Sequence, residues 1–212
     1  MPEIAKILDR PLEKYAVELV NVDSVAFSPF VNLFSSQNVQ TCFSKVAIVT
    51  DDDRCTKKSE TNYINKDFDY DDVNSDISGK LLSGTPSERC NELETSCRAV
   101  GINVFKATKT LEYALCCDEN NIEYFIEAIK SEYSQLGPAL EQKVNSLHDM
   151  NEKAACVWLF IRAREKCKGA IAQYISQIIK KQCEMRKRGE NIEKEFVIPD
   201  YLKEAVYCVT ER

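Results

Sequence analysis

The sequence predicts an α/β protein, with a parallel sheet flanked by helices and a mostly helical C-terminal part. The stretch Val46–Val49 is apolar and rich in β-branched residues, which is typical of a strand buried on both faces of a parallel sheet. Helical and strand patterns alternate around it, whereas beyond residue 120 the apolar residues recur at helical spacing. We therefore expect an α/β unit over residues 1–120 and a helical part over residues 121–212.

The other elements of the α/β unit follow from local patterns. Apolar residues at helical spacing predict helices, and short β-branched runs predict strands. The expected helices are Met1–Arg10, Ala26–Ser35 and Glu88–Val100. The expected additional strands are Val17–Val22 and Ile102–Phe105.

The stretch Lys57–Ser87 differs from the rest of this unit. It is rich in Ser, Asn and Asp and has few periodic apolar positions, so we expect a long polar loop or a partly disordered insertion. Its aspartates resemble the start of a calcium-binding loop. However, the sixth position is Asp72 rather than Gly and the twelfth is Ser78 rather than Glu, so a solvated acidic loop is expected instead.

Helical patterns fill the second part of the chain. An apolar face runs from Ile122 to Tyr133, and Gly137-Pro138 is expected to break that helix. Three more helices are expected at about Glu152–Arg164, Lys168–Lys187 and Asp200–Val209.

The composition excludes several kinds of chemistry. His148 is the only histidine and is expected at the surface, so most catalytic zinc sites are excluded. The ten cysteines contain no C-x-x-C pair and are expected to be reduced and mostly buried. The alternative for the adjacent Cys116 and Cys117 is an oxidised pair. No glycine-rich phosphate loop is present, which argues against nucleotide hydrolysis.

Charge and hydropathy bear on location and partners. No apolar run approaches the roughly 18 residues that span a bilayer, and the first ten residues lack a signal-peptide layout, so a cytoplasmic protein without membrane contact is expected. The net charge of −6 disfavours nucleic-acid binding by the whole surface, but it does not exclude a local basic face.

Carboxylates cluster after the predicted central strand, where ligands bind in open α/β sheets. If the chain stays extended past Thr50, Asp51 and Asp53 project to the same side. Converging carboxylates repel each other unless a cation lies between them, and Mg²⁺ or Mn²⁺ suits oxygen ligands. Glu112, beyond the next strand, could join them. The alternatives are an ordinary acidic turn and, for Glu112, a place in the first turn of a helix.

A basic cluster lies at the start of a late helix. It includes Lys166 and Lys168, and Lys180 and Lys181 continue the positive charge along the same helix. Facing an acidic metal site, these lysines could hold a phosphate backbone. A solvated helical face is the alternative.

Six stretches together resemble the C-terminal Toprim region of the OLD family, which are ATP-dependent endonucleases of bacteria and phages. They occur in the family's order and run nearly from end to end of the chain. The stretches are Pro11–Tyr15, Val20–Val22 with the following Ala26-Phe27, Val46–Asp53, Lys109–Tyr113, Lys168–Ile175 and Val197–Val206.

This resemblance implies a Toprim-like sheet and divalent-metal-dependent hydrolysis of DNA phosphodiester bonds. Asp51 and Asp53 match the family's Asp-x-Asp pair, which holds divalent metal, and Glu112 matches the acidic position that supplies a further ligand. Lys168 resembles the lysine proposed to stabilise charge at the scissile phosphate. The implied cofactor is Mg²⁺ or Mn²⁺, and the implied partner is DNA.

The chain departs from the family pattern at its start. The first strand with its Glu-Gly-x-x-x-Glu type motif is missing, and so is the preceding ATPase domain. We therefore expect an N-terminally truncated Toprim domain. Two functions stay open: an endonuclease domain, or a non-catalytic remnant that serves as an interaction or assembly module. The partners expected besides DNA are a second copy of the chain in a homo-oligomer, or a partner chain that supplies the missing strand and ATPase.

Overall fold

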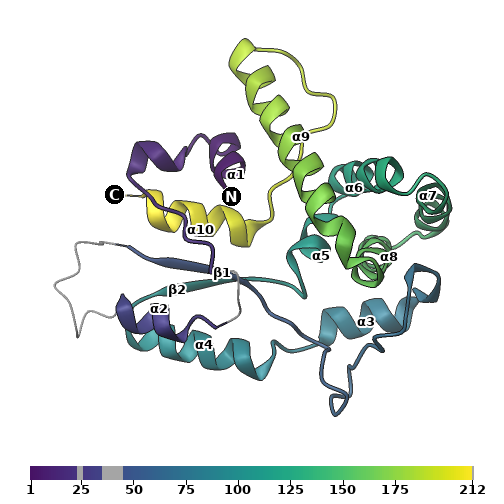
Figure 1. The fold of residues 1–212 in the computed structure, drawn as a ribbon, viewed down its shortest axis with the longest axis horizontal. Helices are drawn as coiled ribbons and strands as arrows, with labels where there is room; N and C mark the ends of the chain where they lie inside the picture. The colour runs from purple at the N-terminus through teal and green to yellow at the C-terminus, as the bar shows by residue number, and fades with distance from the viewer. Residues whose placement is uncertain (23–25, 35–44, 212) are drawn as a thin grey trace.

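The computed structural model describes residues 1–22, 26–34 and 45–211. Within these ranges the chain is mostly helical and contains one small parallel sheet of two strands packed against helices (Figure 1). A group of helices from the second half of the chain lies beside the sheet (Figure 1). A parallel sheet with flanking helices and a helical C-terminal part is therefore confirmed.

The sheet consists of β1 (Ala47–Asp51) and β2 (Asn103–Ala107). The strands run parallel, and the register pairs Asp51 with Ala107 at their carboxyl ends. Backbone hydrogen bonding continues beyond the strands, because the N–H of Asp52 donates to the carbonyl of Ala107 over 3.1 Å. The segments that follow the two strands thus stay side by side where the predicted site begins.

Helices cover both faces of the sheet. Helix α10 (Asp200–Thr210) lies on one face, and α4 (Glu88–Ala99) lies on the other with α2 (Ser28–Leu33) beside it (Figure 1). The face toward α4 and α2 encloses a small apolar core. Its buried residues are Val31, Ile48, Leu93, Cys97 and Ile102.

Two strand predictions differ from the structure. Only Ile48 of β1 is buried, so the predicted burial of Val46–Val49 on both faces is wrong. A two-stranded sheet is too narrow to enclose every side chain of a strand. The predicted strand Val17–Val22 is also wrong: it pairs with neither β1 nor β2, and Leu19 and Val20 are 55% and 59% exposed. A strand needs a neighbour to accept and donate its backbone hydrogen bonds.

The N-terminal segment packs on helix α9 (Lys168–Arg188) and on the last helix, α10. It contains α1 (Pro2–Ile7), where proline occupies the first helical position, and the short 3₁₀ helix η1 (Leu12–Tyr15). The expected helix Met1–Arg10 is thus confirmed in a shorter form. Helix α2 is likewise shorter than predicted, and the end of that prediction, Ser35, lies outside the described residues.

The prediction that Lys57–Ser87 is a loop is wrong in its second half. Residues Tyr70–Asp72 form the 3₁₀ helix η2, and Ser75–Ser83 form helix α3. The side chain of Asn74 accepts a hydrogen bond from the N–H of Ile77 over 3.0 Å and thereby caps α3. Ile77 and, one turn later, Leu81 are buried in the main core. Two apolar positions are enough for a short helix that packs on a large core, although they are too few to produce a clear pattern.

The second part of the chain is helical, as predicted. Helix α5 (Leu111–Cys116) still belongs to the first part, and the second part consists of α6 (Glu119–Glu132), α7 (Leu136–Ser146), α8 (Met150–Ala163), η3 (Glu165–Cys167), α9 (Lys168–Arg188) and α10. Helix α8 is buried along its second half, and α3, α5, α6 and α7 pack around it, whereas α9 packs on α6 and on α1. The break predicted at Gly137-Pro138 falls just before these residues, which lie in the first turn of α7. No helix in the described ranges is long and apolar enough to cross a membrane.

The cysteines agree with the prediction of reduced thiols. In the described ranges every cysteine is free, and only Cys117 and Cys208 are not buried. Cys42 lies outside those ranges. His148 is exposed, as predicted.

Candidate functional site

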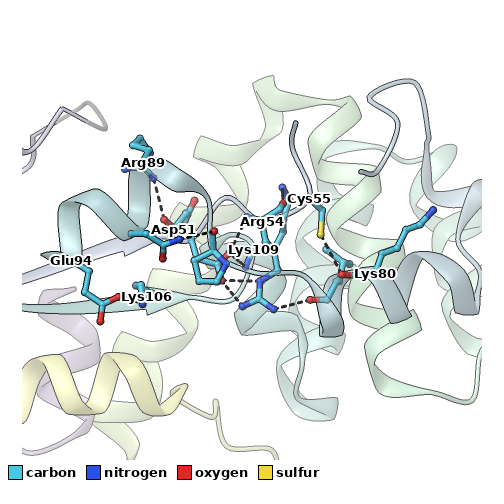
Figure 2. Close-up of polar contacts among 12 residues, drawn as sticks. Asp51, Arg54, Cys55, Lys80, Arg89, Glu94, Lys106 and Lys109 are labelled. Atoms are coloured by element: carbon cyan, nitrogen blue, oxygen red, sulfur yellow. Dashed lines mark hydrogen bonds and ion pairs between the residues drawn. The ribbon is translucent and has the colours of Figure 1, made fainter. Parts of the chain in front are cut away.

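The candidate site lies where β1 ends and the chain enters the sequence Asp51-Asp52-Asp53-Arg54. Each of the three carboxylates has a different set of partners, and these partners come from separate elements. Figure 2 shows the polar contacts that converge here from α4 and from the segment after β2. The three aspartates therefore have to be considered one at a time.

Of the three aspartates, Asp52 has a structural role. Its side chain is buried, and one oxygen, Oδ1, accepts hydrogen bonds from the backbone N–H groups of Arg54 (3.1 Å) and Lys109 (2.9 Å). The other oxygen, Oδ2, accepts from Nε and Nη2 of Arg54 over 2.8 and 2.6 Å. The Arg54 guanidinium also donates to the carbonyl of Leu81 over 2.9 Å (Figure 2). Asp52 thus joins the two strand ends to α3.

Lys109 supports the same junction from a buried position. Its Nζ donates to the carbonyl of Arg54 over 2.6 Å and lies 5.3 Å from the ring centroid of Trp158. Burial lowers the pKa of this lysine. Its backbone is in the left-handed region, with φ of 66°, at the turn between β2 and α5. The sequence analysis did not identify Lys109 or the Asp52–Arg54 pair as parts of the site. The pair could have been found, because an arginine two residues after an aspartate at a strand end is a local pattern that indicates an ion pair.

Asp53 is directed toward α4. Its backbone turns into the left-handed region, with φ of 51°, so the extended chain that would place Asp51 and Asp53 on the same side is not present. Its Oδ2 instead accepts a hydrogen bond from Nη2 of Arg89 over 2.7 Å. The same nitrogen lies 3.2 Å from the carbonyl oxygen of Asp51 (Figure 2). Nothing near Asp53 in the sequence indicated Arg89, which is 36 residues away.

Asp51 lies at the N-terminus of α5. Its Oδ1 accepts a hydrogen bond from the backbone N–H of Leu111 over 2.9 Å. Burial, and next the negative charge of Glu112, raise the pKa of Asp51 to about 6. Thr110 caps the same helix by accepting from the N–H of Tyr113. Asp51 is therefore a partly buried carboxylate that faces a second one.

Glu112 and Lys168 complete this group. Glu112 is in the first turn of α5, as the alternative interpretation held, and this position also brings it close to Asp51. Its Oε1 lies 3.5 Å from Nζ of Lys168, the first residue of α9. Asp51, Glu112 and Lys168 thus meet although they come from three separate elements.

Tyr201 reaches the same place from α10 and was missed by sequence reasoning. Its hydroxyl is buried and has no hydrogen-bond partner among the described residues. Burial, followed by the charges of Asp51 and Glu112, raises the pKa of this phenol. It lies within the stretch Val197–Val206, but the pattern of that stretch gave no reason to single out the tyrosine. It adds a neutral hydroxyl to a group of charged side chains.

Part of this arrangement suits a divalent cation. Asp51 and Glu112 supply oxygen donors, and their mutual repulsion is what a cation relieves. Asp53 does not join them, because its backbone turns the side chain toward α4, where its carboxylate pairs with Arg89. Accordingly, no three or more His, Cys, Asp or Glu side chains in the described part of the chain are arranged to hold a metal ion. Asp51 and Glu112 are the residues that would hold one.

The remaining predicted lysines are exposed and lie on two elements. Lys166 is in η3, and Lys180 and Lys181 lie on the outer face of α9, opposite its buried isoleucines. None of these three lysines forms an ion pair within the described ranges. The C-terminal end of α9 projects beyond the other helices (Figure 1). At 1.5 Å per residue, Lys180 lies about 18 Å along the helix from Lys168.

Comparisons with known proteins add no relative to this description. No family model matches the chain, and no curated protein and no solved structure is significantly similar to it. The function therefore has to be argued from the site itself.

Proposed function

We propose that the chain is a divalent-metal-dependent DNA endonuclease domain of the Toprim type that OLD-family nucleases carry. The observation that carries the proposal is the meeting of Asp51, Glu112 and Lys168 beside the carboxyl ends of two parallel strands. Ligands of open α/β sheets bind at such ends. Two carboxylates and one lysine also match the residues to which the resemblance assigns metal binding and charge stabilisation.

The chemistry is hydrolysis of a phosphodiester bond. Mg²⁺ or Mn²⁺, when bound, supplies positive charge for the phosphate and lowers the pKa of a bound water. Asp51 and Glu112 would hold that cation through their carboxylate oxygens. Lys168 is 45% exposed, so its ammonium group is free to turn from Glu112 toward a phosphate oxygen. Its interaction with Glu112 keeps it at the site before DNA arrives.

DNA is held, on this proposal, along α9. The exposed lysines Lys166, Lys180 and Lys181 supply positive charge that is not used within the described chain. Phosphate contacts of this kind give affinity without sequence specificity. The expected cytoplasmic location is consistent with DNA as the substrate.

A second candidate is a non-catalytic Toprim remnant that serves as an interaction or assembly module. It is favoured by the pairing of the carboxylates with cations of the chain itself. Arg54 neutralises Asp52, Arg89 neutralises Asp53, and Lys168 lies beside Glu112. Three of the four carboxylates at this strand end are thus paired with a cation of the chain, which leaves Asp51 alone for a metal to neutralise. The partner of this module would be a second copy of the chain or another chain that completes the sheet.

Calorimetric titration with Mn²⁺ separates the two candidates. The parent chain is compared with Asp51→Asn, with Glu112→Gln and with the control Asp67→Asn, which changes an exposed aspartate that is not part of the group. The amide introduced by Asp51→Asn keeps an oxygen that can accept from the N–H of Leu111, so the fold should be preserved. An endonuclease domain binds Mn²⁺, loses that binding in the first two variants and keeps it in the control.

Nicking of supercoiled plasmid then tests the activity. The endonuclease proposal expects Mn²⁺-dependent nicking by the parent and none by Lys168→Ala. Nicking that persists in Lys168→Ala, Asp51→Asn and Glu112→Gln would show that this site assignment is wrong. A parent chain that neither binds Mn²⁺ nor nicks DNA, but self-associates in analytical ultracentrifugation, would support the assembly module.

A further inference from the structure

We propose that Tyr201 is a positioning residue of the site: its hydroxyl donates a hydrogen bond to the carboxylate of Glu112 when Lys168 turns away toward a phosphate. This inference rests on the proposed function, because that function is what requires Lys168 to leave Glu112. It gives a role to a buried hydroxyl that has no partner among the described residues. The predicted chemistry makes no use of this tyrosine.

Contacts at the start of α10 place Tyr201 near Glu112. The buried side-chain amide of Asn121, in α6, donates to the carbonyls of Leu115 in α5 (2.9 Å) and of Val197 (2.7 Å). Its oxygen accepts from the N–H of Val197 over 2.8 Å. Asn121 thereby ties α5 to the chain just before α10. Tyr201 lies in the first turn of α10, and this end of the helix is directed toward α5 (Figure 1). The tyrosine is therefore held beside α5, whose first turn carries Glu112.

The Tyr201 hydroxyl is a donor without an acceptor. The oxygen is buried and has no hydrogen-bond partner in the described part of the chain, while the ring packs against the main core. Burial, and then the charges of Asp51 and Glu112, raise the pKa of the phenol, so it keeps its proton at neutral pH. A buried donor without a partner is unfavourable, and a hydrogen bond to a carboxylate removes that cost. The two carboxylates that act on the phenol are the acceptors available to it.

Of these two carboxylates, Glu112 is the one that can change its partner. Asp51 is the last residue of β1, and its Oδ1 is already held by the N–H of Leu111 over 2.9 Å. Glu112 has the longer side chain and is 22% exposed. Its Oε1 lies 3.5 Å from Nζ of Lys168, which is longer than a charge-assisted hydrogen bond. Rotation about the side-chain bonds of Glu112 therefore exchanges a loose contact with Lys168 for a bond from Tyr201.

The exchange keeps Glu112 satisfied while Lys168 acts on the substrate. When Lys168 turns to a phosphate, it removes the cation beside a partly buried carboxylate. Glu112 would then remain charged next to Asp51, and the two carboxylates repel each other. The hydrogen bond from Tyr201 stabilises the charge of Glu112 and fixes its orientation. Tyr201 thus lowers the cost of moving Lys168.

A double-mutant cycle on the thermal unfolding of the whole chain, in the presence of a chelator, tests this exchange. Lys168→Met alone should lower Tm little, because Tyr201 takes over Glu112. Tyr201→Phe alone should leave Tm unchanged or raise it, because it removes a buried donor that has no acceptor among the described residues. In the double variant Glu112 has neither partner. Its Tm should therefore lie about 2–4 °C below the value that the two single shifts predict by addition.

Two further variants show whether the coupling is specific. Tyr113→Phe is the matched control, because it removes a buried hydroxyl of α5 whose charged neighbours are Arg54 and Asp149. It should not couple to Lys168→Met. Glu112→Ala removes the proposed acceptor, so the coupling between Lys168 and Tyr201 should vanish when the cycle is repeated in that background.

The outcomes separate this inference from the proposed function. Additive single effects, equal coupling in the control, or coupling that survives Glu112→Ala would overturn the role of Tyr201. A double variant that is unfolded although both single variants are folded is the extreme form of the expected coupling. In a parent chain that nicks DNA, Tyr201→Phe should lower kcat about tenfold and leave KM unchanged. Coupling in a parent chain that shows no Mn²⁺-dependent nicking would support the exchange at Glu112 and overturn the endonuclease proposal.

Discussion

The carboxylate of Asp52 and the backbone N–H of Lys109 are joined by a 2.9 Å hydrogen bond just beyond the last paired residues of β1 and β2. This bond continues the sheet by means of a side chain where the strands have ended. The same carboxylate neutralises Arg54, so the junction is also an ion pair that is almost completely buried. The site is therefore built on a buried charge that itself takes no part in the proposed chemistry.

Asp52→Ala should lower the free energy of unfolding by about 3–5 kcal/mol, because it leaves the Arg54 charge buried without its partner. Asp52→Asn should cost less, because an amide oxygen can still accept from Lys109. Urea unfolding followed by Trp158 fluorescence measures both values. Asp67→Ala changes an exposed aspartate and is the control. A loss below about 1 kcal/mol for Asp52→Ala, in the range of a surface pair, would contradict this account.

Asp51 should make the metal-free protein less stable as the pH rises. Folding raises its pKa from 3.8 to about 6, so the folded state binds this proton more tightly than the unfolded state does. The contribution of the Asp51 proton to the stability of the folded protein is fully present below pH 3.8. It is lost as the pH rises through about 6. Asp51→Asn removes the charge, so at pH 7.5 it should stabilise the protein by about 1–3 kcal/mol.

Thermal unfolding of the parent and of Asp51→Asn between pH 4 and pH 8, in the presence of a chelator, checks this dependence. The difference between the two proteins should grow with pH and level off above about pH 7. A variant less stable than the parent at pH 7.5 would mean that the Asp51 charge is satisfied in the folded protein.

The adjacent thiols Cys116 and Cys117 should resist modification in the folded protein. Burial raises the pKa of Cys117 to about 11, and the pKa of the fully buried Cys116 is raised well above its ordinary value. Although Cys117 reaches the surface, its Sγ donates to the carbonyl of Tyr113 over 3.3 Å. Only the thiolate reacts with iodoacetamide. Labelling of both cysteines at pH 8 should therefore be much slower in the native state than in urea. Rapid native labelling, or a Cys116–Cys117 disulfide under mild oxidation, would refute the prediction.

The part of the site that the sequence predicted rests on two rules of general validity. A β-branched run followed by carboxylates indicates a strand end with a potential site, and the Ala47–Asp51 strand with Asp51 at its end agrees with that rule. Glu112 follows a second strand, and parallel strands bring their carboxyl ends to one edge. Both inferences needed only local pattern and the direction of the strands.

The rest depends on contacts between distant elements, which leave no local pattern. Arg89 pairs with Asp53 because α4 begins beside the end of β1, and neither residue reveals this by its neighbours in the sequence. Tyr201 reaches Asp51 and Glu112 only because α10 lies across the sheet. Similarly, Val17–Val22 has the composition of a strand but lacks a strand partner within the described chain. Strand formation is a property of a pair of segments.

Lys180→Ser/Lys181→Ser should weaken DNA binding and reduce its salt dependence. Each lysine that neutralises a phosphate releases counterions, so the slope of log K against log salt should fall by about two for the double variant. Fluorescence polarisation of a labelled duplex at several salt concentrations measures the slope. Lys14→Ser/Lys58→Ser removes the same charge from exposed lysines outside α9 and is the control. Because the chain has a net charge of −6, a general loss of positive charge would weaken binding in both variants alike. An equal loss in the control would therefore show that net charge, and not the exposed face of α9, determines the affinity.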